Sequence, residues 1–159
     1  PFYFELARRG DRPLSFAMID VDHFKHYNDT QGHPKGDIVL QELAKLFLQR
    51  VRQTDIACRY GGEEFAVLFL DTSIEEATLV AETLRRKVAY HEFPFGKEQP
   101  GGCLSVSVGV AQLTADMLEP MDLVARADQA LYAAKHAGRN RVATADGPHD
   151  ITTGSDIDE

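Results

Sequence analysis

The segment RYGGEEF at residues 59–65 lies between two short runs of strand-like composition, residues 55–60 and residues 65–70. Two glycines between such runs indicate a β-hairpin turn, because glycine enters positive φ without strain. Glu63 and Glu64 then lie side by side at the mouth of the turn. Because adjacent carboxylates repel each other, the pair predicts a site for a metal ion or another cationic ligand.

A second acidic position follows an apolar run at residues 14–20, which predicts a buried strand. This run ends at Asp20, and open sheets place ligand sites at such strand ends. If the strand lies beside the hairpin, we expect Asp20 to face Glu63. Such an oxygen-rich site suits Mg²⁺, which binds one or two carboxylates together with phosphate oxygens. For Asp22 we expect a simpler role, as the cap of a helix that starts near His23.

Composition limits the classes of function. The 159 residues are the size of one domain, and 43% hydrophobic with 26% charged residues is typical of a globular protein. The net charge of −8 argues against a broad surface for a nucleic-acid polymer, so a bound nucleotide is expected to be small and metal-bridged. We expect Cys58 and Cys103 to be buried thiols in a reducing cytosol. No segment reads as a signal peptide or membrane span, which predicts a cytoplasmic domain that a region upstream of residue 1 could anchor to a membrane.

The rest of the chain alternates helical and strand-like segments. Helices are expected at residues 2–9, 23–29, 35–51, 73–90 and 120–137, and strands at residues 14–20, 55–60, 65–70, 104–110 and 141–144. We expect Ser73 to be an N-cap, Gly138 to follow a helix end, and residues 92–102 to form an irregular loop.

This order of elements predicts an α+β sandwich of the ferredoxin-like or palm type, with a mainly antiparallel central sheet flanked by helices. The polar, acidic segment 146–159 predicts a disordered tail or linker, which leaves residues 1–145 as the folded domain.

Four motifs occur along the chain in one order. They are DVDHFK at residues 20–25 with Asn28, GHPKGD at residues 32–37, GGEEF at residues 61–65, and ADQALYAAK at residues 127–135 followed by GRNR at residues 138–141. Together they resemble the GGDEF domain of diguanylate cyclases, which condense two GTP molecules into cyclic di-GMP, and the similarity spans roughly residues 1–145. Glutamate replaces the signature aspartate, a chemically equivalent change. The family's usual Asp-x-Leu-Thr-Gly-Leu-x-Asn-Arg stretch before the first helix is absent, either trimmed or lost.

The resemblance implies a metal site and a catalytic role for the signature acids. Asp20 and Glu63 resemble the ligands of Mg²⁺ (or Mn²⁺), with the carbonyl of Val21 as a third oxygen and Glu64 completing a two-metal site. In the family the residue at the position of Glu63 is also proposed as the base for the 3′-hydroxyl.

The same resemblance implies residues that bind the phosphates. The amides of residues 21–25, including those of Phe24 and Lys25, stand at a helix start, which favours anions. Lys135 and Arg139 match the family's phosphate-binding pair. The alternative for each is a solvated cation near the end of a helix, stabilised by the helix dipole.

Asn28 and Asp37 resemble the pair that reads guanine. A carboxylate accepts from both N1–H and N2–H₂ of guanine, and adenine lacks this donor pair, so Asp37 is expected to reject ATP. His33 is a candidate to line the nucleoside pocket, with a structural or surface role as the alternative.

The segment from Arg52 to Asp55 resembles the family's RxxD inhibitory motif. Arginine pairs with guanine O6 and N7 and aspartate accepts from its N1 and N2, which implies a product site with feedback inhibition. The alternative is a surface ion pair worth only ~0–1 kcal/mol.

The motifs therefore predict a diguanylate cyclase domain that binds GTP, makes cyclic di-GMP and works as a homodimer, under an upstream sensory or regulatory domain. One alternative is a catalytically silent receptor for GTP or cyclic di-GMP. Another is a different palm-fold nucleotidyl cyclase or polymerase, which ATP turnover would indicate.

Overall fold

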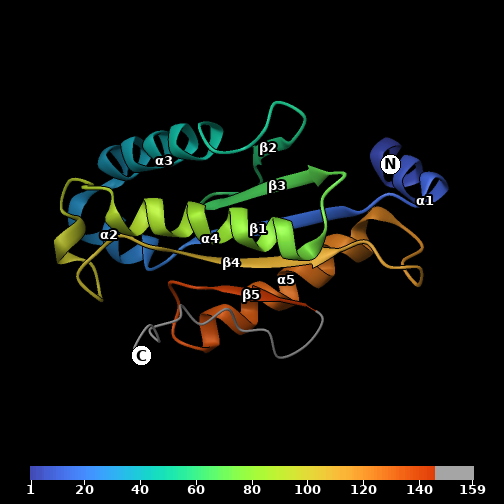
Figure 1. Ribbon diagram of the computed structural model, residues 1–159. Coiled ribbons are helices and arrows are strands. Elements are labelled where there is room, and N and C mark those ends of the chain that lie inside the picture. The colour runs from blue at the N-terminus through green and yellow to red at the C-terminus, as the bar shows by residue number, and fades with distance from the viewer. Residues whose placement is uncertain (146–159) are drawn as a thin grey trace, which may run out of the picture.

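The computed structural model describes residues 1–145 as one sheet with helices on both faces (Figure 1). The expectation of a disordered tail or linker at residues 146–159 lies outside the described residues. The helices are α1 (Phe2–Gly10), α2 (Phe24–Gln31), α3 (His33–Leu48), α4 (Ile74–Tyr90) and α5 (Pro120–His136), with a short 3₁₀ helix η1 (Gly96–Glu98). The strands are β1 (Leu14–Val21), β2 (Ile56–Arg59), β3 (Glu64–Leu70), β4 (Val106–Gln112) and β5 (Val142–Thr144).

The strands lie in the order β2-β3-β1-β4-β5, and the pairing is antiparallel except between β4 and β5. Strand β1 is central, so its C-terminal end is flanked by β3 on one side and by β4 on the other. The predicted α+β class with a mainly antiparallel sheet is confirmed.

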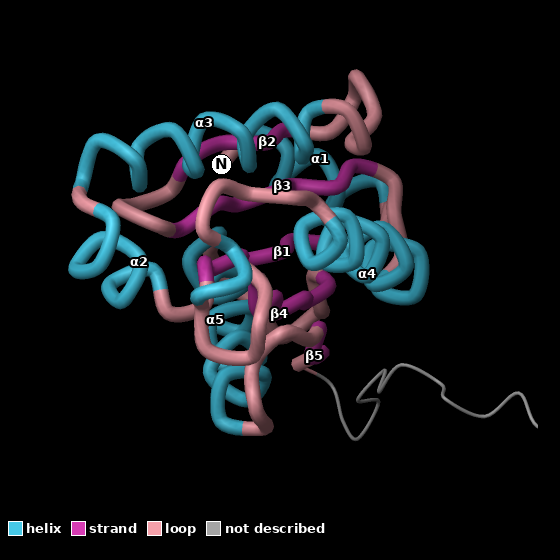
Figure 2. Tube along the Cα trace, turned by 90° about the vertical axis from the view of Figure 1, so that its left-hand side faces the viewer, coloured by secondary structure: helices cyan, strands magenta, loops and turns pink. Residues whose placement is uncertain are grey.

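The two faces of the sheet bury separate cores. Alternate residues of β1 divide between them, because successive side chains of a strand point to opposite faces. Ala17 and Ile19 pack with α2, α3 and α4, whereas Met18 packs with α1 and α5. Figure 2 shows α4 and α5 on opposite sides of the sheet.

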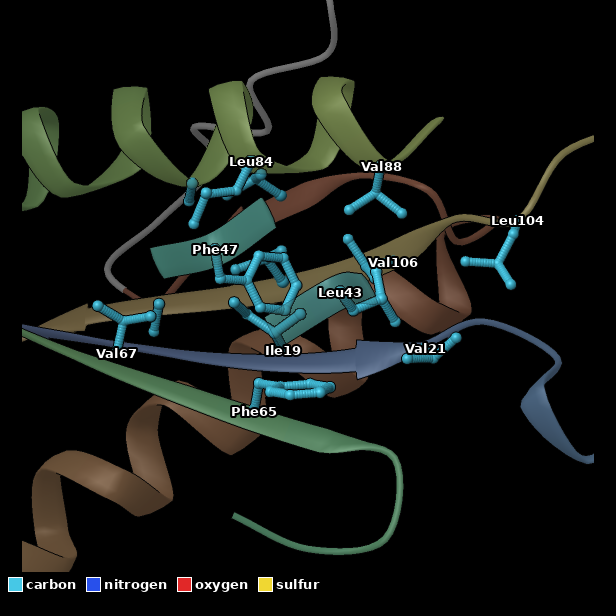
Figure 3. Close-up of a cluster of buried hydrophobic side chains, with 14 of the residues drawn as sticks. Ile19, Val21, Leu43, Phe47, Phe65, Val67, Leu84, Val88, Leu104 and Val106 are labelled. Carbon is cyan, nitrogen blue, oxygen red and sulfur yellow. The ribbon is translucent and has the colours of Figure 1, made fainter. Parts of the chain in front are cut away.

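The larger core lies under α3 and α4. Figure 3 shows Leu84 and Val88 of α4 above the strand residues Ile19 and Val106. Phe47 of α3 meets Phe65 of β3 edge to face, with ring centroids 5.1 Å apart. Because Phe65 directly follows the two signature glutamates, this core anchors the strand that presents them.

Helix α5 lies unusually close to β4 at Gly109. A Cβ atom at this position would stand 2.2 Å from the carbonyl oxygen of Ala127 and 2.2 Å from the amide nitrogen of Leu131. The missing side chain therefore lets the backbone of α5 rest on the sheet, which sets the position of Lys135 one turn further along that helix.

Local signals account for several helix ends. Ser73 caps α4 in a reciprocal pair with Glu76, as expected for an N-cap. Gly138 follows α5 with φ 123°, as expected for a helix end. Gly32 separates α2 from α3, and α3 starts at His33 because Pro34 suits the first turn of a helix.

Two local predictions are wrong. The cysteines are not both buried, because Cys58 is exposed on the edge strand β2 and Cys103 is half-buried in the loop before β4. The hairpin between β2 and β3 is present, yet neither Gly61 nor Gly62 has positive φ. Instead Gly62 faces open space, since a Cβ there would have no neighbour within 4 Å.

Within residues 1–145, none of the helices combines the length and apolar character that crossing a membrane requires.

We predict that Gly109→Ala destabilises the domain by about 1–3 kcal/mol, because overpacking of the α5–β4 contact forces the backbones apart. Urea unfolding followed by circular dichroism measures the change. Gly62→Ala is the matched control, since its added methyl group enters open space. Equal stability of the two variants would contradict the close approach of α5.

Candidate active site

The acidic site lies at the C-terminal end of β1. In the register of β1 and β3, Asp20 is directly opposite Glu64. The expectation that Asp20 faces Glu63 is therefore wrong by one residue, and Glu63 instead accepts a hydrogen bond from the amide of Val21 through its carbonyl, at 3.2 Å. Directly opposed residues of an antiparallel pair share one face of the sheet, so the carboxylates of Asp20 and Glu64 are neighbours.

Lys135 of α5 reaches this pair from the face that α5 covers. Its ammonium group donates to Asp20 Oδ2 at 2.9 Å, and the Asp20 side chain is only 8% exposed. The lysine that the motif assigns to phosphate binding is thus held at the acidic site by a carboxylate.

The two carboxylates have perturbed acidity. Burial raises the pKa of the Asp20 carboxyl, although the nearby Lys135 opposes the shift. Burial, followed by the charge of Asp20, also raises the pKa of the Glu64 carboxyl. Both shifts mean that negative charge accumulates here at a cost, which a bound cation would offset.

The residues present fit a divalent ion that the nucleotide helps to bind. Among residues 1–145, no group of three or more His, Cys, Asp or Glu side chains is arranged to hold a metal ion. Mg²⁺, however, is usually bound through one or two carboxylates together with substrate phosphates. Asp20 and Glu64 provide two such carboxylates, and burial raises the pKa of each.

The start of α2 lies next to this pair and presents free backbone amides. The amides of Val21 and Asp22, which were expected to face an anion, are already bonded to the carbonyls of Glu63 and Ser105. Those of His23, Phe24 and Lys25 have no acceptor among the described residues, and the side chain of His23 makes no cap. The segment with free amides is therefore shorter than predicted. The Phe24 ring is buried against Tyr27, so only its amide faces outward, and the Lys25 side chain is exposed.

Asp22 does not cap α2, contrary to expectation. It is buried, and its carboxylate accepts from Ser105 Oγ at 2.7 Å and from Ser107 Oγ at 2.6 Å. It also accepts from the amide of Asn140 at 2.9 Å. Three donors from distant segments satisfy this carboxylate, so it ties the end of β1 to β4 and to the loop after α5.

Arg139 lies in that loop, directly after Gly138, and its side chain is exposed. The structure thus brings Lys135 to Asp20 and leaves Arg139 at the nearby surface, with no side-chain partner among the described residues. An exposed arginine at the end of α5 remains available to an incoming anion.

Asn28 lies where α2 meets α3. Its Oδ1 is buried and has no hydrogen-bond partner. A Cβ on Gly36 would lie 1.9 Å from that oxygen, so only glycine leaves room for it. Asp37 follows Gly36 on α3 and is exposed, and His33 is exposed at the start of the same helix. An unpaired amide oxygen beside an exposed carboxylate offers acceptors to a ligand with several N–H donors.

Arg52 and Asp55 form a compact turn before β2. The Arg52 amide donates to Asp55 Oδ2 at 2.9 Å and its Nε lies 3.5 Å from the same oxygen. The Arg52 guanidinium also donates to the carbonyl of Leu70 and to the hydroxyl of Thr72. Asp55 Oδ1 is buried without a partner, so this carboxylate retains an unused acceptor.

Sequence reasoning missed several residues that shape the site. Arg59 donates to the carbonyl of Gly62 at 3.0 Å and so holds the signature turn. Asp128 of α5 contributes to the raised pKa of Glu64. Asp128 and Asn140 lie inside motifs that were already noted, whereas the position of Arg59 directly before the glycines was the one available signal for its role.

Comparisons with known proteins agree with this geometry. The chain matches the family model "Diguanylate cyclase, GGDEF domain" over residues 3–141. It is 44% identical over 129 residues to diguanylate cyclase A of Treponema denticola, covering 81% of this chain and 34% of that protein. It is 40% identical over 136 residues to the response regulator PleD of Caulobacter vibrioides, covering 86% of this chain and 30% of that protein. The chain therefore spans about a third of the length of these curated relatives.

Solved structures show the same likeness. The active GGEEF domain of a diguanylate cyclase from Vibrio cholerae superposes with a TM-score of 0.84 at 38% identity, covering 92% of both chains. The GGDEF domain of DgcB from Caulobacter crescentus, in complex with c-di-GMP, superposes with a TM-score of 0.84 at 33% identity, covering 92% of this chain and 85% of that one.

The palm-like sheet and these matches define a domain of the nucleotidyltransferase-type cyclase class. Within that class, the chain belongs to the GGDEF family of diguanylate cyclase domains.

We predict that Glu64→Gln raises the melting temperature of the metal-free domain near neutral pH. Because the folded-state pKa of Glu64 lies above its ordinary value of 4.5, ionised Glu64 destabilises the fold at neutral pH. The gain should shrink as pH falls through the raised pKa and vanish below the ordinary value, where the carboxyl is protonated in both states. Thermal unfolding in EDTA across pH measures it.

The control for this prediction is Glu92→Gln, at an exposed loop position. It should leave the melting temperature nearly unchanged at every pH. A Glu64→Gln variant that is less stable than the parent at neutral pH would contradict the charge repulsion.

Proposed function

We propose that this domain is a diguanylate cyclase, which condenses two GTP molecules into cyclic di-GMP and releases pyrophosphate. The observation that carries the proposal is the pair of carboxylates at the end of β1, buried Asp20 and half-buried Glu64, with Lys135 beside them. This is a site for a metal–triphosphate complex, in a chain that belongs to the diguanylate cyclase family.

Asp20, Glu63, Glu64 and the carbonyl of Val21 would hold Mg²⁺ (or Mn²⁺). When bound, the metal neutralises the triphosphate and the charge that develops at the α-phosphorus. Of these residues, Asp20 and Glu64 already share one face of the sheet. Glu63 directly precedes β3 and is the candidate base for the 3′-hydroxyl.

Two elements of the chain would bind the phosphates. The free amides at the start of α2 donate to phosphate oxygens, with the helix dipole adding to the attraction. Lys135 would exchange its bond to Asp20 for a phosphate once the negative charge of that carboxylate is compensated, and Arg139 would approach from the loop after α5.

Guanine would occupy the junction of α2 and α3. The unpaired Oδ1 of Asn28 and the exposed carboxylate of Asp37 are acceptors that match the N–H donors of guanine. Bound adenine would leave these acceptors unpaired, which is the costly outcome on which such discrimination depends. His33 borders this region at the start of α3.

One site per chain binds one GTP, so the reaction needs two chains that face each other. The 3′-hydroxyl of one GTP attacks the α-phosphorus of the other and displaces pyrophosphate, and a second, reciprocal attack closes the ring. Positioning by the homodimer converts the encounter of two nucleotides into a reaction between held groups.

Regulation would act on this pairing of domains. The structure of diguanylate cyclase SiaD from Pseudomonas aeruginosa is a complex with its activator SiaC, and the chain covers 54% of that longer protein at 36% identity. By analogy, we propose that an upstream sensory or regulatory domain controls this one. The substrate of the domain is GTP and not a nucleic-acid polymer.

The turn of Arg52 and Asp55 is proposed as the product-inhibition site. Asp55 Oδ1 is buried without a partner, so a guanine edge that reaches it would meet an unused acceptor. The Arg52 side chain is 60% exposed and can pair with the same base.

The test is incubation of the domain with GTP and Mg²⁺ over a range of protein concentrations, with products identified by mass spectrometry. We expect cyclic di-GMP at a rate that rises more steeply than linearly with protein, because the dimer is the active species. Glu63→Ala should lower turnover by about 10³-fold, the scale of losing one electrostatic contribution at the transition state.

The outcomes separate the alternatives. GTP binding without product would indicate a receptor, and turnover of ATP would indicate a different nucleotidyl cyclase. Glu63→Ala activity within a few-fold of the parent would contradict the metal and catalytic assignment.

We predict that Arg52→Ala weakens cyclic di-GMP binding by at least about 10-fold, the effect of losing a charged hydrogen bond. Initial rates before product accumulates should stay within about 2-fold of the parent, because Arg52 lies outside the acidic site. Titration calorimetry and full progress curves measure the two effects. Arg50→Ala, an exposed arginine two residues earlier, is the control, and unchanged product affinity in Arg52→Ala would refute the assignment.

A further inference from the structure

A buried ion pair lies on α4, away from the acidic site. Glu82 and Arg85 are 8% and 7% exposed. Arg85 donates from Nε and Nη2 to the two carboxylate oxygens of Glu82, at 2.9 Å and 2.6 Å. Buried charges are costly unless their remaining hydrogen-bonding groups are also satisfied. The stability of this pair therefore depends on what Nη1, the remaining nitrogen of the guanidinium, contacts.

The remaining nitrogen of the guanidinium reaches the loop after α5. Arg85 Nη1 donates to Oδ1 of Asn140 at 2.8 Å. Asn140 directly follows Arg139 in the loop after α5. Helices α4 and α5 lie on opposite sides of the sheet (Figure 2). The bond from Arg85 therefore connects the loop after α5 to α4, on the opposite face of the sheet from α5.

The loop needs such support because its backbone is strained. Gly138 has φ 123°, and Arg139 and Asn140 follow with φ 64° and 46°. Two successive non-glycine residues in the left-handed region are unfavourable and persist only when surrounding contacts enforce them. The Arg85 bond is one such contact.

The second contact runs through Asp22. The amide of Asn140 donates to Asp22 Oδ2, and the hydroxyls of Ser105 and Ser107 complete the shell of that carboxylate. Asp22 directly precedes His23, where the free amides of α2 begin. Asn140 therefore joins two anion-facing elements, its side chain bonded to Arg85 and its amide to Asp22.

We propose that Arg85, acting through Asn140, is a positioning residue for the triphosphate of GTP. It holds Arg139 and the start of α2 at a fixed separation, without touching the nucleotide itself. The inference rests on the proposed function, since the anion in question is the triphosphate of the substrate. Loss of the contact should therefore weaken binding of the phosphates and leave binding of the base unchanged.

The experiment compares Arg85→Lys, Asn140→Gly and Arg86→Ala with the parent. Arg85→Lys keeps the charge that Glu82 needs but cannot donate to both residues in the same geometry. Asn140→Gly leaves the buried ion pair whole and tolerates the left-handed backbone, so it removes only the acceptor. Arg86→Ala is the matched control, because Arg86 also pairs with Glu82, at 3.1 Å, but is largely exposed and makes no bond to Asn140.

Binding is measured by calorimetry with two probes, Mg²⁺–tripolyphosphate and guanosine, and melting temperatures are recorded alongside. We expect Arg85→Lys and Asn140→Gly each to weaken tripolyphosphate binding by about 10-fold, with guanosine affinity within about 2-fold of the parent. The double variant should lose little more than either single one, because both remove the same bond. Arg86→Ala should bind both probes like the parent.

Two results would overturn the inference. In one, the variants melt at lower temperature yet bind tripolyphosphate like the parent, so the network is only structural. In the other, the parent itself does not bind tripolyphosphate, so there is no anion site to position. Failure of the proposed function is seen separately, as a parent that binds both probes but forms no cyclic di-GMP from GTP.

Discussion

The electrostatic repulsion between Asp20 and Glu64 is the constraint on which the rest of the site depends. The register of β1 and β3 places these carboxylates opposite each other, and burial raises the pKa of both. Lys135 partly offsets the repulsion by bonding to Asp20. The fold thus holds two carboxylates close together at a cost that a bound cation would offset, which is how a site can be prepared for a metal-bound nucleotide.

Maintaining this charge requires rigid supports on both faces of the sheet. On one face, the absence of a side chain at Gly109 lets α5 lie close to β4 and brings Lys135 to the acidic pair. On the other face, Phe65 packs against Phe47 and anchors the strand that follows the signature turn. The acidic site therefore lies where the two cores meet, and packing from both sides resists the repulsion between Asp20 and Glu64.

A second polar centre, around Asp22, organises the elements that face the phosphates. Its carboxylate is satisfied by Ser105, Ser107 and the amide of Asn140, and Asn140 in turn accepts from Arg85. The two aspartates at the C-terminal end of β1, Asp20 and Asp22, thus differ in their surroundings. Asp20 lies opposite another acid and is suited to a ligand, whereas Asp22 is surrounded by donors and is suited to holding backbone in place.

The sequence by itself determined most of the elements and marked the candidate site residues, because these signals are local. Apolar periodicity marked β1 and α4, Ser73 and Gly138 marked helix ends, and the signature acids marked the site. Only the tertiary structure decided that Asp20 faces Glu64. It also decided that Asp22 is a buried acceptor for the loop after α5 instead of a helix cap, and that Arg85 bonds to the same loop. Strand register and the partners of a buried charge depend on segments far apart in the chain, so no local pattern encodes them.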